Sequence, residues 1–366
     1  MSKKKFNPEI DLLKFIFSII IVLYHTKNLT AISSADITIL PYGFTGVEFF
    51  FIISGYLMVK SSKKFEGKPI GRSTADFLIN KIKSFYPYFI FSFVIAFLVR
   101  QFTFFVDKDQ SLVAFLKGSV LSINELLLLH NTGVDFGTIY NGPTWYLSAM
   151  ILGMAIIFPV LLKHKNWFVN LGSLVVPILI YAFSSQEKGT LNSLGWSGFL
   201  NYGILRAIAG LGLGCFIGAM IDRLQENNIT LRRFFKIALW LVEAGLFGLL
   251  IVIMQFEGKN KFDYIAVIVT FFICFIMLSG LTGVQNILPG KICSLLGRFS
   301  LVIYLNHRYV AFLINTLAPE LSPEKTMAVY LGASVVVAVV AEIIVSASKA
   351  IWGKISPTVK GMVFAK

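Results

Sequence analysis

Long apolar runs, repeated along the whole chain, constrain its fold more than any other feature of the sequence. Most runs have about 20 residues, the length that an α-helix needs to cross the hydrocarbon core of a membrane. Within that core the backbone must satisfy its own hydrogen bonds, which favours helices. The sequence therefore predicts an all-α polytopic membrane protein with about ten transmembrane helices, over residues 10–29, 42–60, 84–101, 144–163, 167–184, 200–221, 234–254, 262–282, 298–318 and 326–347.

The composition agrees with a membrane protein and excludes other classes. Of the 366 residues, 56% are hydrophobic and 14% are charged, whereas soluble domains contain about 25% charged residues. The net charge of +14 does not predict a nucleic acid partner, because the basic residues lie mainly in the short loops between apolar runs. We expect a single membrane domain over residues 1–366, surrounded by membrane lipids. We expect no metal, because the three cysteines lack metal-ligand spacing.

The distribution of basic residues predicts the orientation in the membrane. If residues 111–130 do not span, 22 of the 33 Lys and Arg residues lie on the side of the N-terminus and 7 lie on the other side. Because basic loops stay in the cytoplasm, we expect a multi-pass protein of the plasma membrane with both termini cytoplasmic. Residues 111–130 then form a re-entrant helix or a helix on the outer surface, which either lines a groove or rests at the interface.

Ionisable residues inside the first two apolar runs are the first candidates for function, because charge is costly within a membrane. Lys14 and His25 are eleven residues apart, which on a helix means roughly the same face and a rise of about 16 Å. If the second run returns through the membrane, Glu48 lies at a depth similar to that of His25. The two side chains are then able to pair, and the carboxylate would orient the imidazole.

Three ordered motifs resemble a known family. Lys14, ten residues and His25 resemble the basic-x10-His motif of the membrane acyltransferase-3 family. The segment GVEFFFIISGY (46–56) is similar to that family's G-V-D-x-F-F-x-x-S-G-F signature, with Glu48 in place of Asp. The segment GRFSLVIYLNH (297–307) is similar to its G-x-x-S-Y-x-x-Y-L-x-H motif.

The resemblance implies an integral membrane O-acetyltransferase of surface polysaccharides. Such an enzyme moves an acyl group, expected to be acetyl, from cytosolic acetyl-CoA to a hydroxyl of a cell-surface or lipid-linked glycan. His25 would be the general base, oriented by Glu48. Ser54 would either carry the acyl group or bond a backbone carbonyl of its own helix beside Gly55, as serines in spanning helices usually do.

The basic stretch 60–83 is predicted to be the largest cytoplasmic loop, and it allows two interpretations. It either holds the protein to anionic lipid or binds the phosphates of coenzyme A. For the second, the candidates are Lys81, Lys83 and Arg72, together with Lys14. Where the family usually has Arg-x-x-Arg, this chain has Lys81 and Ser84, so the bidentate guanidinium fork is absent.

Later apolar runs carry four further candidates for substrate binding. Trp145 and Tyr146 resemble the start of the family's Trp-x-Leu segment, or are interfacial aromatic residues. Arg206 either binds an anionic acceptor or pairs with Glu243. His307, which stands next to Arg308, is either a hydrogen-bonding residue within the bundle or part of the site.

Two other classes of function fit the same buried charges. A proton-coupled secondary transporter or glycan exporter also needs ionisable residues in the membrane. Such transporters often contain internal repeats, and the sequence shows no convincing one. A sensor or scaffold without catalysis is the third alternative, and it would be favoured if His25 were dispensable.

Overall fold

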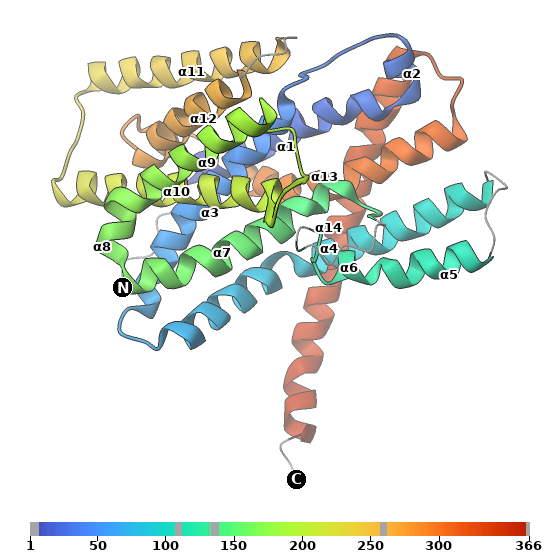
Figure 1. The fold of residues 1–366 in the computed structure, drawn as a ribbon, viewed down its shortest axis with the longest axis horizontal. Helices are drawn as coiled ribbons and strands as arrows, with labels where there is room; N and C mark the ends of the chain where they lie inside the picture. Colours follow the sequence, from blue (N-terminus) through green and yellow to red (C-terminus); the bar gives the residue numbers. More distant parts are fainter. Residues whose placement is uncertain (1–6, 107–111, 131, 133–138, 257–261, 364–366) are drawn as a thin grey trace.

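The protein is almost entirely helical in this computed structural model, which describes residues 7–106, 112–130, 132, 139–256 and 262–363 (Figure 1). The first half contains α1 (Pro8–Tyr24), α2 (Thr30–Ser34), α3 (Gly46–Ser62), α4 (Ile70–Val106), α5 (Leu112–Leu121), α6 (Ile123–Leu126) and α7 (Trp145–Lys163). The second half contains α8 (Lys165–Trp167), α9 (Ser173–Lys188), the short hairpin β1 (Trp196–Ser197) and β2 (Leu200–Asn201), α10 (Tyr202–Glu226), α11 (Arg233–Gln255), α12 (Phe262–Ser279), α13 (Gly290–Leu317) and α14 (Pro323–Val363).

The predicted all-α polytopic membrane fold is confirmed. In the described ranges, eight helical stretches are long and apolar enough to cross a membrane, and they contain α3, α4, α7, α9, α10, α11, α12 and α14. The two other predicted spans are also helical, but α1 has 17 residues and α13 carries Asn306, His307 and Arg308 in succession. The two helices pack against each other, through Ser18 of α1 and Ser300 of α13.

The predicted cytoplasmic loop 60–83 is a loop only in its middle. Helix α3 continues to Ser62 and α4 already begins at Ile70, so residues 70–83 form the first half of a 37-residue helix. The reason is a buried apolar contact, since Phe77 stacks on Phe158 of α7 with ring centroids 4.0 Å apart. The predicted span 84–101 is therefore part of a longer helix.

Residues 112–130 form two short helices rather than one. Helix α5 has 10 residues and α6 has 4, and both are too short to cross a membrane. One side of the pair is apolar and exposed, with Leu112, Val113 and Val120 each more than 60% accessible. Their position at the outer surface stays a prediction.

Two close helix contacts position the centre of the bundle. Helices α3 and α10 cross with no room for side chains, because a Cβ on Gly55 would overlap the carbonyl of Leu211 and a Cβ on Gly214 would overlap that of Ile52. Helix α1 packs on α13, where Ser18 and Ser300 hydrogen-bond through their hydroxyl groups at 2.8 Å. Together α1, α3, α7 and α13 enclose the candidate site.

Candidate functional site: two stacked cavities

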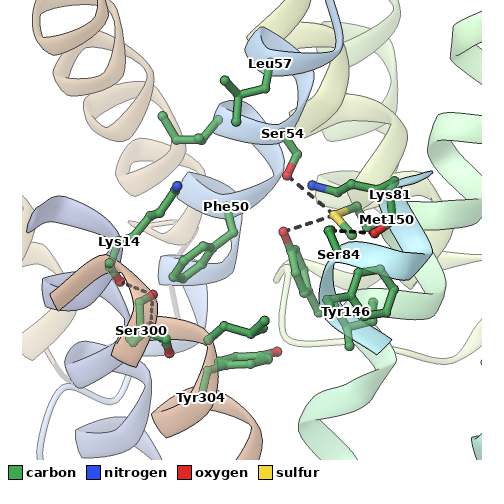
Figure 2. A pocket seen from close by; sticks show the side chains of 16 residues that line it. Lys14, Phe50, Ser54, Leu57, Lys81, Ser84, Tyr146, Met150, Ser300 and Tyr304 are labelled. Carbon is green, nitrogen blue, oxygen red and sulfur yellow. Dashed lines mark hydrogen bonds between the residues drawn. The ribbon is translucent and has the colours of Figure 1, made fainter. Parts of the chain in front are cut away.

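A first cavity of about 250 Å³ lies between α1, α3, α4, α7 and α13. Lys14 of α1 and Lys81 of α4 lie on opposite sides of it, and Phe50 and Ser54 of α3 lie between them (Figure 2). The rest of the lining is largely apolar. We call this the lysine cavity.

A second cavity of about 210 Å³ lies beyond the end of α1. His25, Trp145, Arg206 and Arg308 line it. We call this the histidine cavity.

The two cavities are stacked along the helices of the bundle. Along α1 and α13 the residues that line the lysine cavity come first and those of the histidine cavity follow, whereas α3 and α7 run in the opposite direction. Tyr304 lines both cavities, and no other described residue does. Its hydroxyl donates a hydrogen bond to the carbonyl of Pro143 at 2.7 Å, which holds the ring between the cavities.

His25 begins the one-turn helix η1 (His25–Asn28) after α1. Nδ2 of Asn28 lies 2.8 Å from the backbone oxygen of His25 and 3.1 Å from its ring Nδ1. Because an amide nitrogen only donates, Nδ1 is the acceptor and the neutral ring carries its proton on Nε2. Asn315 of α13 donates to the carbonyl of Asn28 at 2.8 Å and fixes this turn.

His307 lies against His25, with ring centroids 5.0 Å apart. It is fully buried and does not line the histidine cavity. Its Nδ1 donates to the carbonyl of Ile303 at 3.3 Å, and its Nε2 has no hydrogen-bond partner among the described residues. The last motif of the sequence therefore brings an unpaired imidazole nitrogen next to the first motif.

The expected pair of Glu48 with His25 does not form. One carboxylate oxygen accepts from Nε of Arg206 at 2.7 Å and the other accepts from the Tyr181 hydroxyl at 2.9 Å. The reason is the orientation of α3, which turns Glu48 towards α10, where its carboxylate lies against Gly210. Arg206 is thereby paired with Glu48 and not with Glu243.

The three motifs thus converge in the structure, and a comparison with known protein families agrees with them. The acyltransferase-3 family model, described as an acyltransferase domain, matches residues 7–346. The chain belongs to this family. No curated protein and no solved structure matches the chain. Membership shows that the protein is an acyltransferase of the membrane type.

The structure places the predicted basic residues of this acyltransferase unevenly. Lys14 and Lys81 face the lysine cavity, whereas Lys83 and Arg72 are exposed and line neither cavity. On a helix, positions two apart point about 200° away from each other, so Lys83 turns outwards where Lys81 turns inwards. Arg72 lies nine residues, or about 14 Å, before Lys81 along α4.

Ser54 lines the lysine cavity, and within the described ranges no hydrogen bond joins it to a histidine or a carboxylate. Its hydroxyl donates to the sulfur of Met150 at 3.5 Å, a weak bond, and not to a carbonyl of its own helix as expected. The hydroxyl of Tyr146 donates to the same sulfur at 3.4 Å. A serine nucleophile needs an adjacent general base, and His25 lines the other cavity.

Tyr146 is buried and Trp145 is partly buried, and each lines one of the two cavities. Tyr146 lines the lysine cavity, while Trp145 lines the histidine cavity with the Arg206 guanidinium 5.2 Å from its ring centre. Glu125 of α6 holds the preceding turn by accepting from the backbone N–H groups of Tyr140 and Asn141. The segment 112–130 thus supports the wall of the site.

Sequence reasoning missed Tyr304 and Asn28. Tyr304 is a fixed position of the third motif, so the motif itself contained the signal. Asn28 follows the first motif by three residues and carries no pattern that marks it. No group of three or more His, Cys, Asp or Glu side chains that could hold a metal occurs in the described ranges.

Proposed function

We propose that the protein transfers an acyl group, acetyl in the first place, from acyl-coenzyme A to a hydroxyl of a cell-surface or lipid-linked glycan. The observation that carries the proposal is the pair of stacked cavities. One has two lysines, the other has His25, and Tyr304 is the boundary between them. Donor and acceptor would enter from opposite sides and meet at this boundary.

The lysine cavity suits the donor. The ammonium groups of Lys81 and of Lys14, which pairs with Asp11 at 3.1 Å, supply positive charge for phosphates, and the apolar lining suits the pantetheine arm. Lys14 and His25 are separated along α1 by a rise of about 16 Å, which the arm would cover. The positive-inside rule puts this cavity on the cytoplasmic side with both termini, where coenzyme A is found.

His25 would act as the general base. Its Nδ1 holds the lone pair, and the Asn28 amide occupies that lone pair in the structure. An acceptor hydroxyl that displaces Asn28 would give its proton to Nδ1 while its oxygen attacks the thioester carbon. The carbon–sulfur bond then breaks, and the coenzyme A thiolate takes the proton from the imidazolium. His307, with its unpaired Nε2, would position His25 and stabilise its charged form.

Direct transfer follows from the position of Ser54. Its hydroxyl bonds the Met150 sulfur in the lysine cavity, whereas His25 lines the histidine cavity. We therefore propose a single displacement with no acyl-enzyme. Because the donor reaches the boundary from the cytoplasm, coenzyme A would not have to cross the membrane.

The test uses purified protein in detergent with radiolabelled acetyl-coenzyme A and a panel of methyl glycosides and polyprenyl-phosphate-linked sugars. Wild-type protein should release free thiol and label an acceptor. His25→Ala should bind the donor normally but transfer about 10²–10⁴-fold more slowly, the range expected for loss of a general base. Label retained on wild-type protein and lost in Ser54→Ala would contradict direct transfer.

A matched pair of lysines on α4 tests the donor site. Lys81→Ala should weaken donor binding about tenfold, in line with the loss of one charge-assisted hydrogen bond. Lys83→Ala removes the same charge two residues away, on the exposed side of the helix, and should bind as wild type does. Equal effects of the two variants would place coenzyme A outside the lysine cavity.

A further inference from the structure

We propose that the histidine cavity binds an anionic group of the acceptor, a phosphate or a carboxylate, through Arg308. This inference rests on the proposed function in one respect, which is that the anionic ligand is called the acceptor. The preference of the cavity for an anion rests on its own charges.

The two arginines of this cavity differ in their partners. Each nitrogen of the Arg206 guanidinium has a partner: Nε donates to Glu48 at 2.7 Å, and the two terminal nitrogens donate to the carbonyls of Leu191 and Phe44 at 2.9 and 3.4 Å. Arg308 has no ion pair with a described residue, and its Nη1 is shielded from solvent without a hydrogen-bond partner there. The first arginine is structural and the second is available.

The surroundings of Arg308 add positive charge and no described carboxylate. Its guanidinium carbon lies 4.9 Å from the ring centre of Phe312, and that of Arg100 lies 4.4 Å from the same centre. Two arginines thus flank one ring, which concentrates positive charge around Arg308.

The lining of the cavity points to the same ligand chemistry. Its described lining residues include Arg308, Arg206 and His25 but no Asp or Glu. A cation in a membrane protein without a counter-ion is costly, and an anionic ligand removes that cost. Guanidinium groups bind phosphate and carboxylate through two parallel hydrogen bonds. A cavity of about 210 Å³ suits one charged group rather than a chain of sugars.

Two sources would supply such an anion next to a sugar hydroxyl. One is the phosphate of a lipid-linked sugar, and the other is the carboxylate of an acidic sugar. Either would sit on Arg308 and hold the reacting hydroxyl near His25, which lines the same cavity. The acceptor would thus be positioned by charge as well as by shape.

The experiment measures anion binding by thermal unfolding of the full chain in detergent, without acyl donor. Each anion is compared with a neutral analogue: farnesyl phosphate is compared with farnesol, and glucuronate with glucose. We expect at least one anion to raise the unfolding temperature of wild type above its neutral partner, and the responding pair identifies the source. Arg308→Gln should weaken binding of that anion at least tenfold. Arg308→Lys should retain part of the rise in unfolding temperature, and Lys81→Ala should retain all of it.

Opposite results overturn the proposal. The first is that no anion stabilises wild type more than its neutral partner does. The second is that Arg308→Gln binds the anion as tightly as wild type does. The third is that Lys81→Ala loses anion binding, which would place the anion in the lysine cavity. If Arg308→Gln does not fold, Arg308→Lys decides, since unchanged titration in that variant also contradicts the inference. Anion binding without any thioester cleavage would reject the proposed function and leave the anion site standing.

Discussion

At the scale of single residues, the buried pair of Glu48 and Arg206 is the best-defined charged contact of the site. Both side chains are almost inaccessible to solvent, and the Tyr181 hydroxyl completes the hydrogen bonds of the carboxylate. Breaking a buried pair by removing one charge costs about 3–5 kcal/mol, because the other charge stays buried and unpaired. Glu48 is therefore a structural residue that fixes Arg206.

Glu48→Gln should destabilise the protein by about 3–5 kcal/mol, measured by thermal unfolding in detergent. The double variant Glu48→Leu with Arg206→Met should recover a large part of that loss, because it leaves no buried charge. The exposed pair Glu66–Lys165 is the control. Lys165 lowers the pKa of the Glu66 carboxyl, yet Glu66→Gln should have little effect on stability, as for most surface pairs.

Loss of transfer activity by Glu48→Gln without any loss of stability would contradict this assignment. It would restore the orienting role towards His25 that the sequence suggests.

The sequence was sufficient to select the buried ionisable residues but not their partners. Lys14, His25, Glu48 and Arg206 stand out because each interrupts an apolar run. The depth of Glu48 follows from counting residues. The helix face that it occupies depends on where α10 packs, and this is decided by glycines more than 150 residues away.

At the scale of elements, the contact between α3 and α10 shows what a small-residue pattern achieves. Gly210, Gly214 and Gly218 repeat every four residues, which predicts close helix packing. The structure confirms this and adds that α3 is the partner, with Gly55 on its side of the contact. Helix ends were less predictable, because α4 starts early through the contact of Phe77 with Phe158.

Gly214→Ala should destabilise the protein by about 1–3 kcal/mol or more, the usual cost of overpacking. The added methyl group would overlap the backbone of Ile52 and Tyr56, which cannot move aside as a side chain can. Gly245→Ala on α11 is the matched control. That position has open space around it, so the alanine should be neutral or gain up to about 1 kcal/mol.

Thermal unfolding in detergent compares the two glycine variants. Equal unfolding temperatures would show that α3 and α10 are able to separate without loss of the fold.

At the scale of the whole molecule, the lysine cavity and the histidine cavity are stacked within the bundle. Tyr304 contacts both, and its hydrogen bond to Pro143 ties α13 to the start of α7. The sequence grouped Ser54 with His25 and Tyr146 with Trp145, and the structure puts the members of each pair in different cavities. The side of Tyr304 on which a residue lies depends on how α1 and α13 pack against α3 and α7, which run in the opposite direction.

Tyr304→Ala should join the cavities and admit water to the thioester. The ratio of free thiol released to acceptor labelled should rise at least tenfold over wild type. Tyr304→Phe keeps the ring and loses only the bond to Pro143, so its ratio should stay close to that of wild type. A ratio in Tyr304→Ala equal to that of wild type would mean that the ring does not separate the substrates.

The stacked cavities also have a kinetic consequence. Since the two substrates would not share an entrance, neither has to leave before the other arrives, and steady-state rates should fit a ternary-complex scheme in either order of addition. Desulfo-coenzyme A should compete with acetyl-coenzyme A yet leave the affinity for the acceptor unchanged. A compound that fills only the acceptor side would conversely inhibit the enzyme at any concentration of coenzyme A, which makes the two halves of the site independent targets for inhibitors.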